Sequence, residues 1–231
     1  MKRSLTPALV ATIAGFFVCG AADAHVSIIS GPGFAARTQE ITFGVGHGCD
    51  GADTLSVRVD LPPEVVSVRA LTSDFGPVTY ERNTADVVTS VTWEKPQESV
   101  LDADTNYYKL TLRLGVPNQP FTTLYFAAVQ TCQASDGTLT EVEWISTDPT
   151  AMDVEPAAAL VILPPRVPGW NQFTVPEAVE DLSVLFGDAL IVWSGDAAYS
   201  ANPTTAELID GTPDVTALTT LDAGDEIWVK Y

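Results

Sequence analysis

The residues with the clearest chemical potential lie around position 25, where one of only two histidines in the chain follows an Ala-x-Ala sequence. Upstream, the basic pair Lys2-Arg3 precedes an apolar run, so residues 1–24 have the three parts of a secretory signal peptide. Cleavage after Ala24 would leave His25 with two nitrogen donors, the free α-amine and the near imidazole nitrogen. Nitrogen-rich tetragonal sites favour Cu(II). The sequence therefore predicts an N-terminal copper site at His25.

This segment has alternative interpretations. His25 could follow the cleavage site by chance. Cys19 could instead be a lipidation site, although Phe17-Val18 before it lacks the small residue of a lipobox. The apolar run could be a membrane anchor, but it is shorter than the roughly 20 residues that a spanning helix needs and it contains Pro7. We therefore expect an exported protein whose mature chain has no membrane span.

Composition excludes some partners. Hydrophobic residues make up 46% of the 231 residues, enough for a substantial core. The net charge is −19, and loss of residues 1–24 would leave 9 basic and 29 acidic residues. Such a surface repels nucleic acid and anionic lipid, so we expect neither as a partner. No hydrolase triad, phosphate-binding loop or zinc-type spacing is visible in the sequence.

Cysteine usage points to a disulfide. Of three cysteines, Cys19 would leave with the signal peptide, and Cys49 and Cys132 would remain as an even pair. An even pair in a chain destined for an oxidising compartment predicts a Cys49–Cys132 bond. A thiolate copper site is the alternative, and the absence of a C-x-x-C pair disfavours it.

Short segments rich in β-branched and aromatic residues, each bounded by Pro, Gly, Asn or Asp, predict strand after strand up to residue 163. No convincing amphipathic helix interrupts them. We expect an all-β protein, an immunoglobulin-like antiparallel β-sandwich followed by a small β-rich C-terminal domain. The predicted strands of the sandwich are 26–29, 40–45, 55–61, 65–71, 87–93, 107–114, 124–131, 140–145 and 158–163.

The proline-rich stretch Pro164–Pro168 predicts a stiff linker, which divides the mature chain into domains 25–165 and 166–231. Residues 169–231 hold one lysine, 11 acidic residues and three of the five tryptophans. Because tryptophan is usually well buried, we expect these rings to pack in a core rather than to form a ligand platform. Strands are predicted at 171–175, 189–193 and 226–231, with a helix start near Pro176-Glu177, and the tryptophans are Trp170, Trp193 and Trp228.

Several stretches of the first domain carry a family likeness through their order and spacing. They are His25-Val26, the sequence FGVGHGCDG at 43–51, VRVDLP at 57–62, VQTC at 129–132, Asp136-Gly137 leading to Trp144-Ile145, and Pro156-Ala157 before an apolar strand that ends in Pro164. By these stretches, residues 25–165 resemble the YcnI-like copper-binding proteins of bacterial envelopes.

The resemblance implies an immunoglobulin-like sandwich that binds Cu(II) through a single-histidine brace. His25 would supply amine and imidazole, with Trp144 near the metal. An indole nitrogen is donor-only, so Trp144 would lie with its π-face against the cation or limit access to it, and a purely structural role in the core is the alternative. Glu40, Glu141 and Glu143 are conceivable carboxylates for the remaining positions.

The resemblance implies an exported copper-binding protein of copper homeostasis or trafficking, periplasmic or extracellular, and not an enzyme. Its partners would be the copper ion and another envelope copper protein or a transporter. His47 is expected to be structural, within a turn-rich loop. One alternative is a copper-dependent polysaccharide oxygenase that uses His25 and His47, with residues 169–231 as a carbohydrate binder. The other is a metal-free structural or adhesive sandwich.

Overall fold

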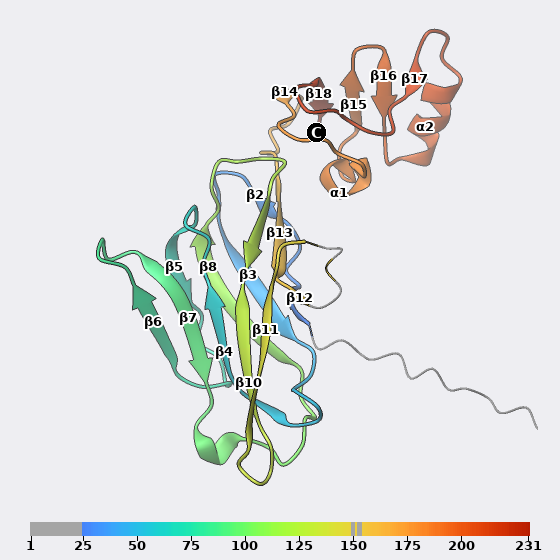
Figure 1. Ribbon diagram of the computed structural model, residues 1–231. Coiled ribbons are helices and arrows are strands. Elements are labelled where there is room, and N and C mark those ends of the chain that lie inside the picture. Colours follow the sequence, from blue (N-terminus) through green and yellow to red (C-terminus); the bar gives the residue numbers. More distant parts are fainter. Residues whose placement is uncertain (1–24, 149–150, 152–153) are drawn as a thin grey trace, which may run out of the picture.

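The structure is a computed structural model that describes residues 25–148, 151 and 154–231. The predicted signal peptide, residues 1–24, lies outside these residues. Figure 1 shows a larger sandwich with a smaller domain beyond one of its ends. Within the described residues, no helix is long and apolar enough to cross a membrane.

The sandwich is built from short, mostly antiparallel strands and a single 3₁₀ turn among its described residues. The elements are β1 (Val26–Ile28), β2 (Gly33–Phe34), β3 (Thr38–Val45), β4 (Asp53–Asp60), β5 (Val66–Ala70), β6 (Val78–Arg82), β7 (Val88–Glu94), η1 (Gln97–Ser99), β8 (Tyr108–Gly115), β9 (Thr123–Phe126), β10 (Ala128–Gln133), β11 (Leu139–Ser146), β12 (Glu155–Pro156) and β13 (Ala158–Leu163).

Two sheets form the layers of the sandwich. One has the order β1-β3-β8-β5 and the other β12-β11-β10-β4-β7-β6, while β2, β13 and β9 form a small third sheet. The inner faces alternate with solvent-facing residues, as the period of two requires. Phe43, Trp93, Leu112, Phe126 and Trp144 are among the buried side chains between the layers. The predicted all-β, immunoglobulin-like sandwich is confirmed.

The predicted strand over 124–131 is two strands in the structure. β9 pairs with β13, and β10 pairs with β4 and β11 in a different sheet, so the chain changes sheets at Ala127. Sequence alternation continues through this point because both strands bury one face. The predicted disulfide is confirmed, with Sγ atoms of Cys49 and Cys132 bonded and Cα atoms 5.7 Å apart.

The C-terminal domain is a five-stranded sheet of order β14-β18-β15-β16-β17 with two helices. Asp181 and Asn202 cap the helices. Asp181 accepts a hydrogen bond from the backbone N–H of Ser183, and Asn202 accepts from those of Thr204 and Thr205. The predicted helix start near Pro176 is wrong by several residues, and the second helix was not predicted. The elements are β14 (Trp170–Thr174), α1 (Leu182–Phe186), β15 (Ile191–Ser194), β16 (Ala197–Tyr199), α2 (Pro203–Asp210), β17 (Thr216–Ala217) and β18 (Glu226–Lys230).

The two domains meet around Arg166, which follows the last strand of the sandwich. Its guanidinium lies 4.8 Å from the ring centroid of Phe34 and 4.9 Å from that of Tyr231, so it stacks against both domains. It also donates two hydrogen bonds to the carboxylate of Asp188. Phe121 of the sandwich joins the hydrophobic cluster of the C-terminal domain. The first part of the proline-rich connection, Pro164 to Arg166, is thus packed rather than free, whereas Val167 and Pro168 are exposed.

Candidate functional site

His25 lies immediately before β1, at the edge of the four-stranded sheet. β1 pairs with β3 in a register that sets Val26 opposite Val45. The side chain of His25 is half-buried. Its imidazole lies 5.3 Å from the indole of Trp144, measured between ring centroids, with the planes tilted by 44°. The structure therefore brings together the two residues that the family resemblance had paired.

Trp144 belongs to the other sheet, so this contact joins the two layers at their edge. In β11 it pairs with Ala128 of β10 and is only 2% exposed. Among the described residues, its indole Nε1 has no hydrogen-bond partner although it is buried. An unpaired buried N–H is costly. The ring is thus part of the core and at the same time forms a wall beside His25.

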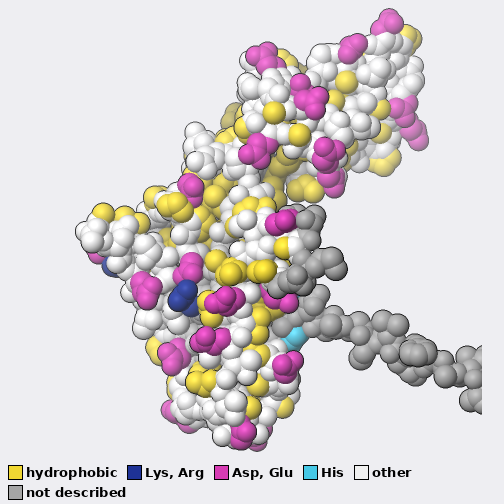
Figure 2. Space-filling model, viewed as in Figure 1, with side chains coloured by type: hydrophobic (Ala, Val, Ile, Leu, Met, Phe, Trp, Pro, Cys, Tyr) yellow, Lys and Arg dark blue, Asp and Glu magenta, His cyan; other side chains and the backbone are white. Residues whose placement is uncertain are grey.

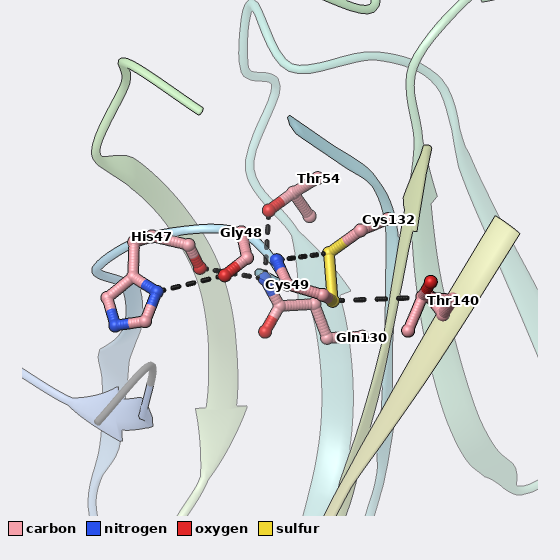
Figure 3. Close-up of a disulfide and its surroundings, with 7 residues drawn as sticks. All are labelled: His47, Gly48, Cys49, Thr54, Gln130, Cys132 and Thr140. Carbon is pink, nitrogen blue, oxygen red and sulfur yellow. Dashed lines mark hydrogen bonds between the residues drawn. A yellow bond between two sulfur atoms is a disulfide. The ribbon is translucent and has the colours of Figure 1, made fainter. Parts of the chain in front are cut away.

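His47 follows β3 at the same end of the β1–β3 pair, so both histidines lie at one end of the sheet. Its Nδ1 is 2.9 Å from the carbonyl oxygen of Gly48, and its own carbonyl accepts a hydrogen bond from Gln130 Nε2 at 2.9 Å (Figure 3). The backbone N–H of Cys49 meets Cys132 Sγ at 2.9 Å. The loop that carries His47 is therefore tied to β10 by the disulfide and by hydrogen bonds.

Gly48 is required by the close approach of this loop to itself. Cys49 and Ala52 form an isolated antiparallel bridge, and a Cβ at position 48 would lie only 1.8 Å from the carbonyl oxygen of Ala52. No side chain fits there without a backbone shift. The short sequence His47-Gly48-Cys49 thus sets the path of the loop as well as its crosslink.

The carboxylates considered from the sequence are not brought to His25. Val45 marks the end of β3 that is next to His25, because it pairs with Val26. Glu40 lies five residues away along the strand, about 16 Å from Val45, where it pairs with Arg113. Glu141 and Glu143 are exposed and alternate with the buried Trp144, so they occupy the opposite face of β11.

The carboxylate that sequence reasoning missed is Glu155. It lies in β12 and pairs with Trp144 in a parallel bridge, and its side chain is half-buried. Only 11 residues separate the two in the sequence, but nothing in the pattern indicated that β12 would add to the edge of the sheet. Only the pairing of β12 with β11 in the folded structure shows that Glu155 lies beside Trp144.

A buried ionic cluster supports the neighbouring part of the sandwich. Lys95 Nζ lies 2.5 Å from Asp53 Oδ2 and 2.6 Å from Tyr108 Oη, and Tyr108 Oη donates to Asp53 Oδ1 at 2.6 Å. Burial alone would raise the pKa of Asp53, but hydrogen bonds from Leu101 N–H, Lys95 and Tyr108 outweigh it and lower that pKa below its ordinary value. Burial and the Asp53 carboxylate raise the pKa of the Tyr108 hydroxyl. Asp53, Lys95 and Tyr108 bond to one another, and the N–H of Leu101 completes the set of donors to Asp53, so the cluster has a structural role.

Within residues 25–148, 151 and 154–231, no three His, Cys, Asp or Glu side chains gather as a metal-binding cluster. On the face that Figure 2 shows, carboxylates lie on both domains and are dispersed rather than collected around one centre. The contact between His25 and Trp144 is the one that joins two residues named from the sequence as a candidate site.

Comparison with solved structures found an uncharacterized protein from Nocardia farcinica that is described as having an immunoglobulin-like fold. It is 25% identical, with 61% of this chain and 99% of that chain covered and a TM-score of 0.49. BcpA, the major pilin subunit of Bacillus cereus, is 9% identical over 69% of this chain and 48% of its own, with a TM-score of 0.37. No curated protein matches the chain.

A family model described as "Domain of unknown function (DUF1775)" matches residues 25–163. The match begins at His25 and ends at the last residue of β13, so it spans the whole sandwich and excludes the C-terminal domain. It covers more than half of the chain, and the chain therefore belongs to the DUF1775 family.

Proposed function

We propose that this chain is an exported Cu(II)-binding protein of copper homeostasis or trafficking, active in the periplasm or outside the cell. The observation that carries the proposal is the approach of the His25 and Trp144 rings to 5.3 Å at the edge of the sandwich. The resemblance to YcnI-like copper-binding proteins names the same two residues. The Cys49–Cys132 disulfide is compatible with an oxidising compartment.

In this proposal, cleavage after Ala24 exposes the α-amine of His25, and copper is held by the amine and the near imidazole nitrogen. Both donors come from one residue, which explains how a site can exist without a cluster of side chains. Trp144 supplies no lone pair. Its buried ring fixes one wall of the site, restricts the approach of solvent and offers a π-face to a cation.

One imidazole and one amine leave coordination positions for exchangeable ligands, which suits a protein that receives and delivers copper. Glu155 is the carboxylate that the strand pairing sets next to Trp144, and we assign it the role of a further ligand or of a hydrogen-bond partner to one. The delivery partner would be another envelope copper protein or a transporter.

The test uses the mature chain beginning at His25, with its terminus verified by mass spectrometry. Copper titration followed by electron paramagnetic resonance should give one site with nitrogen hyperfine coupling. A matched chain whose His25 α-amine is acetylated keeps every side chain but lacks the amine donor of the chelate, and we expect its affinity to fall at least about 100-fold. Equal affinity in the two chains would overturn the proposal.

Further variants sharpen the site. Glu155→Gln should weaken copper binding about 10–100-fold, whereas Glu143→Gln, on the opposite face of β11, should leave the copper affinity unchanged.

Copper uptake should also decline as the pH falls, because the nitrogen donors must be deprotonated to bind. Uptake that is flat from pH 8 to pH 4 would contradict an amine and imidazole chelate.

The register of β1 and β3 places His47 at the same end of the sheet as His25, which keeps the oxygenase alternative testable. That enzyme would require His47 as a second imidazole ligand. Peroxide-driven oxidation of chitin or cellulose by the copper-loaded chain, lost in His47→Ala, would assign catalysis. We expect no such oxidation and unchanged copper affinity in His47→Ala.

A further inference from the structure

The tryptophans of the C-terminal domain are not in its core, so the expectation of core packing is wrong for them. Trp170 is 52% exposed and Trp228 is 47% exposed, while Trp193 is half-buried. Together with Gly195 they line an open hollow of about 410 Å³. Exposed aromatic clusters of this kind mark interaction sites, because leaving them in water is unfavourable.

Strand register explains why the three rings share one face. Across β14, β18 and β15, Gln172, Trp228 and Trp193 form one row, and Trp170, Lys230 and Ile191 form the next. The intervening residues of these strands, including Val192 and Val229, point to the other side and build the hydrophobic core.

The charged side chains near the rings and on the rest of the domain restrict the chemical class of the ligand. Lys230 Nζ lies 5.7 Å from the ring centroid of Trp170, so a cation already occupies this part of the face, which disfavours a quaternary ammonium ligand. The domain itself carries 11 acidic residues and one lysine, which disfavours nucleic acid and other polyanions. A neutral ligand with flat apolar surfaces and hydroxyl groups fits both constraints.

We propose that Trp170, Trp193 and Trp228 form a binding platform for a neutral polysaccharide. The C–H faces of pyranose rings carry partial positive charge and stack on the negative faces of aromatic rings. Gln172 is the cross-strand neighbour of Trp228, and Lys230 is that of Trp170, so both side chains adjoin the rings and can bond to sugar hydroxyls. The outer tryptophans, Trp170 and Trp193, stand two strands apart and are offset by two residues along the strands, roughly 12 Å in all, which is slightly more than the length of a disaccharide unit. The platform therefore fits a chain of sugars rather than a single ring.

Gly195 has no side chain, which keeps one end of the hollow open. It lies in the tight turn between β15 and β16 with φ of +57°, and a Cβ built on it meets no atom within 4 Å. The rim of the hollow at this point is backbone alone, so the end of the platform next to Trp193 stays open to an extended ligand.

The test is binding of the full mature chain to insoluble cellulose and chitin, measured by depletion from solution, and to their hexasaccharides by tryptophan fluorescence. Trp170→Ala and Trp228→Ala should each weaken binding about tenfold, and Trp228→Phe should lie between Trp228→Ala and the unchanged protein. The matched control is Leu208→Ala, because Leu208 is 66% exposed on α2 of the same domain. Thermal unfolding of each variant establishes that it is folded.

Absence of binding to both polysaccharides and both hexasaccharides would overturn the proposal. Binding that survives in the Trp170→Ala/Trp228→Ala double variant would overturn it too, since the sugar would then sit elsewhere. Tryptophan-dependent binding to phosphatidylcholine vesicles or to a polyproline peptide, without sugar binding, would assign the platform to a different ligand. His25→Ala should bind sugar as tightly as the unchanged protein, which separates this proposal from that of a copper site.

Discussion

The two domains use tryptophan in opposite ways. In the sandwich, Trp93 and Trp144 are 0% and 2% exposed and lie between two layers of sheet. In the C-terminal domain, Trp170 and Trp228 lie on the outer face of a single sheet whose other face supplies the core. The residue type is the same, and the number of layers around it differs. A tryptophan inside two layers stabilises the fold, and one outside a single layer is available to a ligand.

The domains also differ in what holds them together. The sandwich contains a disulfide and the buried cluster of Asp53, Lys95 and Tyr108 in addition to its large core. The C-terminal domain has no cysteine. Its smaller core is completed by Phe121 and Leu163 of the sandwich, so its stability depends in part on its neighbour.

Removing the disulfide should cause the largest difference in stability between the two domains, because only the sandwich would lose unfolding free energy directly. The bond closes a loop with a sequence separation of 83 residues. In the chain-entropy model, Cys49→Ala/Cys132→Ala costs about 4.5 kcal/mol of unfolding free energy. Urea unfolding should show a destabilised sandwich, and reduction of the unchanged protein should reproduce the effect. A shift below about 1 kcal/mol would contradict the assigned role.

Paired tryptophan substitutions test the comparison directly. Trp93→Ala removes a fully buried ring and should cost about 3–5 kcal/mol. Trp228→Ala removes an exposed ring and should change stability by no more than about 0.5 kcal/mol. Both are measured by denaturant unfolding. Similar losses in the two variants would mean that Trp228 is a core residue and that the platform is not free.

The buried ion pair gives the next largest effect. Lys95→Met leaves the buried Asp53 carboxylate without its cation and should cost about 3 kcal/mol at neutral pH. Asp53→Leu combined with Lys95→Met should recover much of that loss, because an apolar pair leaves no charge uncompensated. Thermal unfolding of the single and double variants measures both changes. A double variant no more stable than Lys95→Met would contradict the proposed compensation.

Asp53 also predicts an acid dependence. Its pKa is lowered in the folded state, so its contribution to stability is complete above the unfolded value of 3.8 and is lost as the pH falls through the lower folded value. The stability of the unchanged protein should therefore drop more steeply below pH 4 than that of Asp53→Asn, measured by urea unfolding at a series of pH values. Parallel curves would show that the carboxylate is not the charged partner in this cluster.

The smallest effect is expected at the junction. Arg166→Ala removes stacking on Phe34 and Tyr231 and the ion pair with Asp188. Because that pair is partly exposed, we expect a loss of no more than about 1 kcal/mol, together with weaker coupling between the unfolding of the two domains by calorimetry. Arg58→Ala, which removes an exposed pair with Asp60, is the control and should change neither quantity.

Most of the sandwich could be predicted because each strand buries one face, so that apolar and polar residues alternate along its sequence. The strand at Ala158–Leu163 was predicted to the residue, and most others to within one or two. β2, β6 and β12 were missed. β6 is mostly exposed at the edge of its sheet, and β2 and β12 have only two residues each, so none of the three shows a hydrophobic pattern. In the candidate site, His25 was predicted from the expected cleavage site and Trp144 from the family resemblance, whereas Glu155 needed the pairing of β12 with β11.

The sequence alone determined that this protein is a chain of short half-buried strands. It also determined that one histidine follows the Ala-x-Ala sequence of a predicted export signal, and that a single pair of cysteines lies beyond that predicted signal. These are local properties, set by the identity and order of neighbouring residues. Tertiary structure alone decided that His25 and Trp144 meet across two sheets and that three tryptophans share an outer face. Both outcomes depend on strand register and on the number of packed layers, which join residues that are distant in the chain.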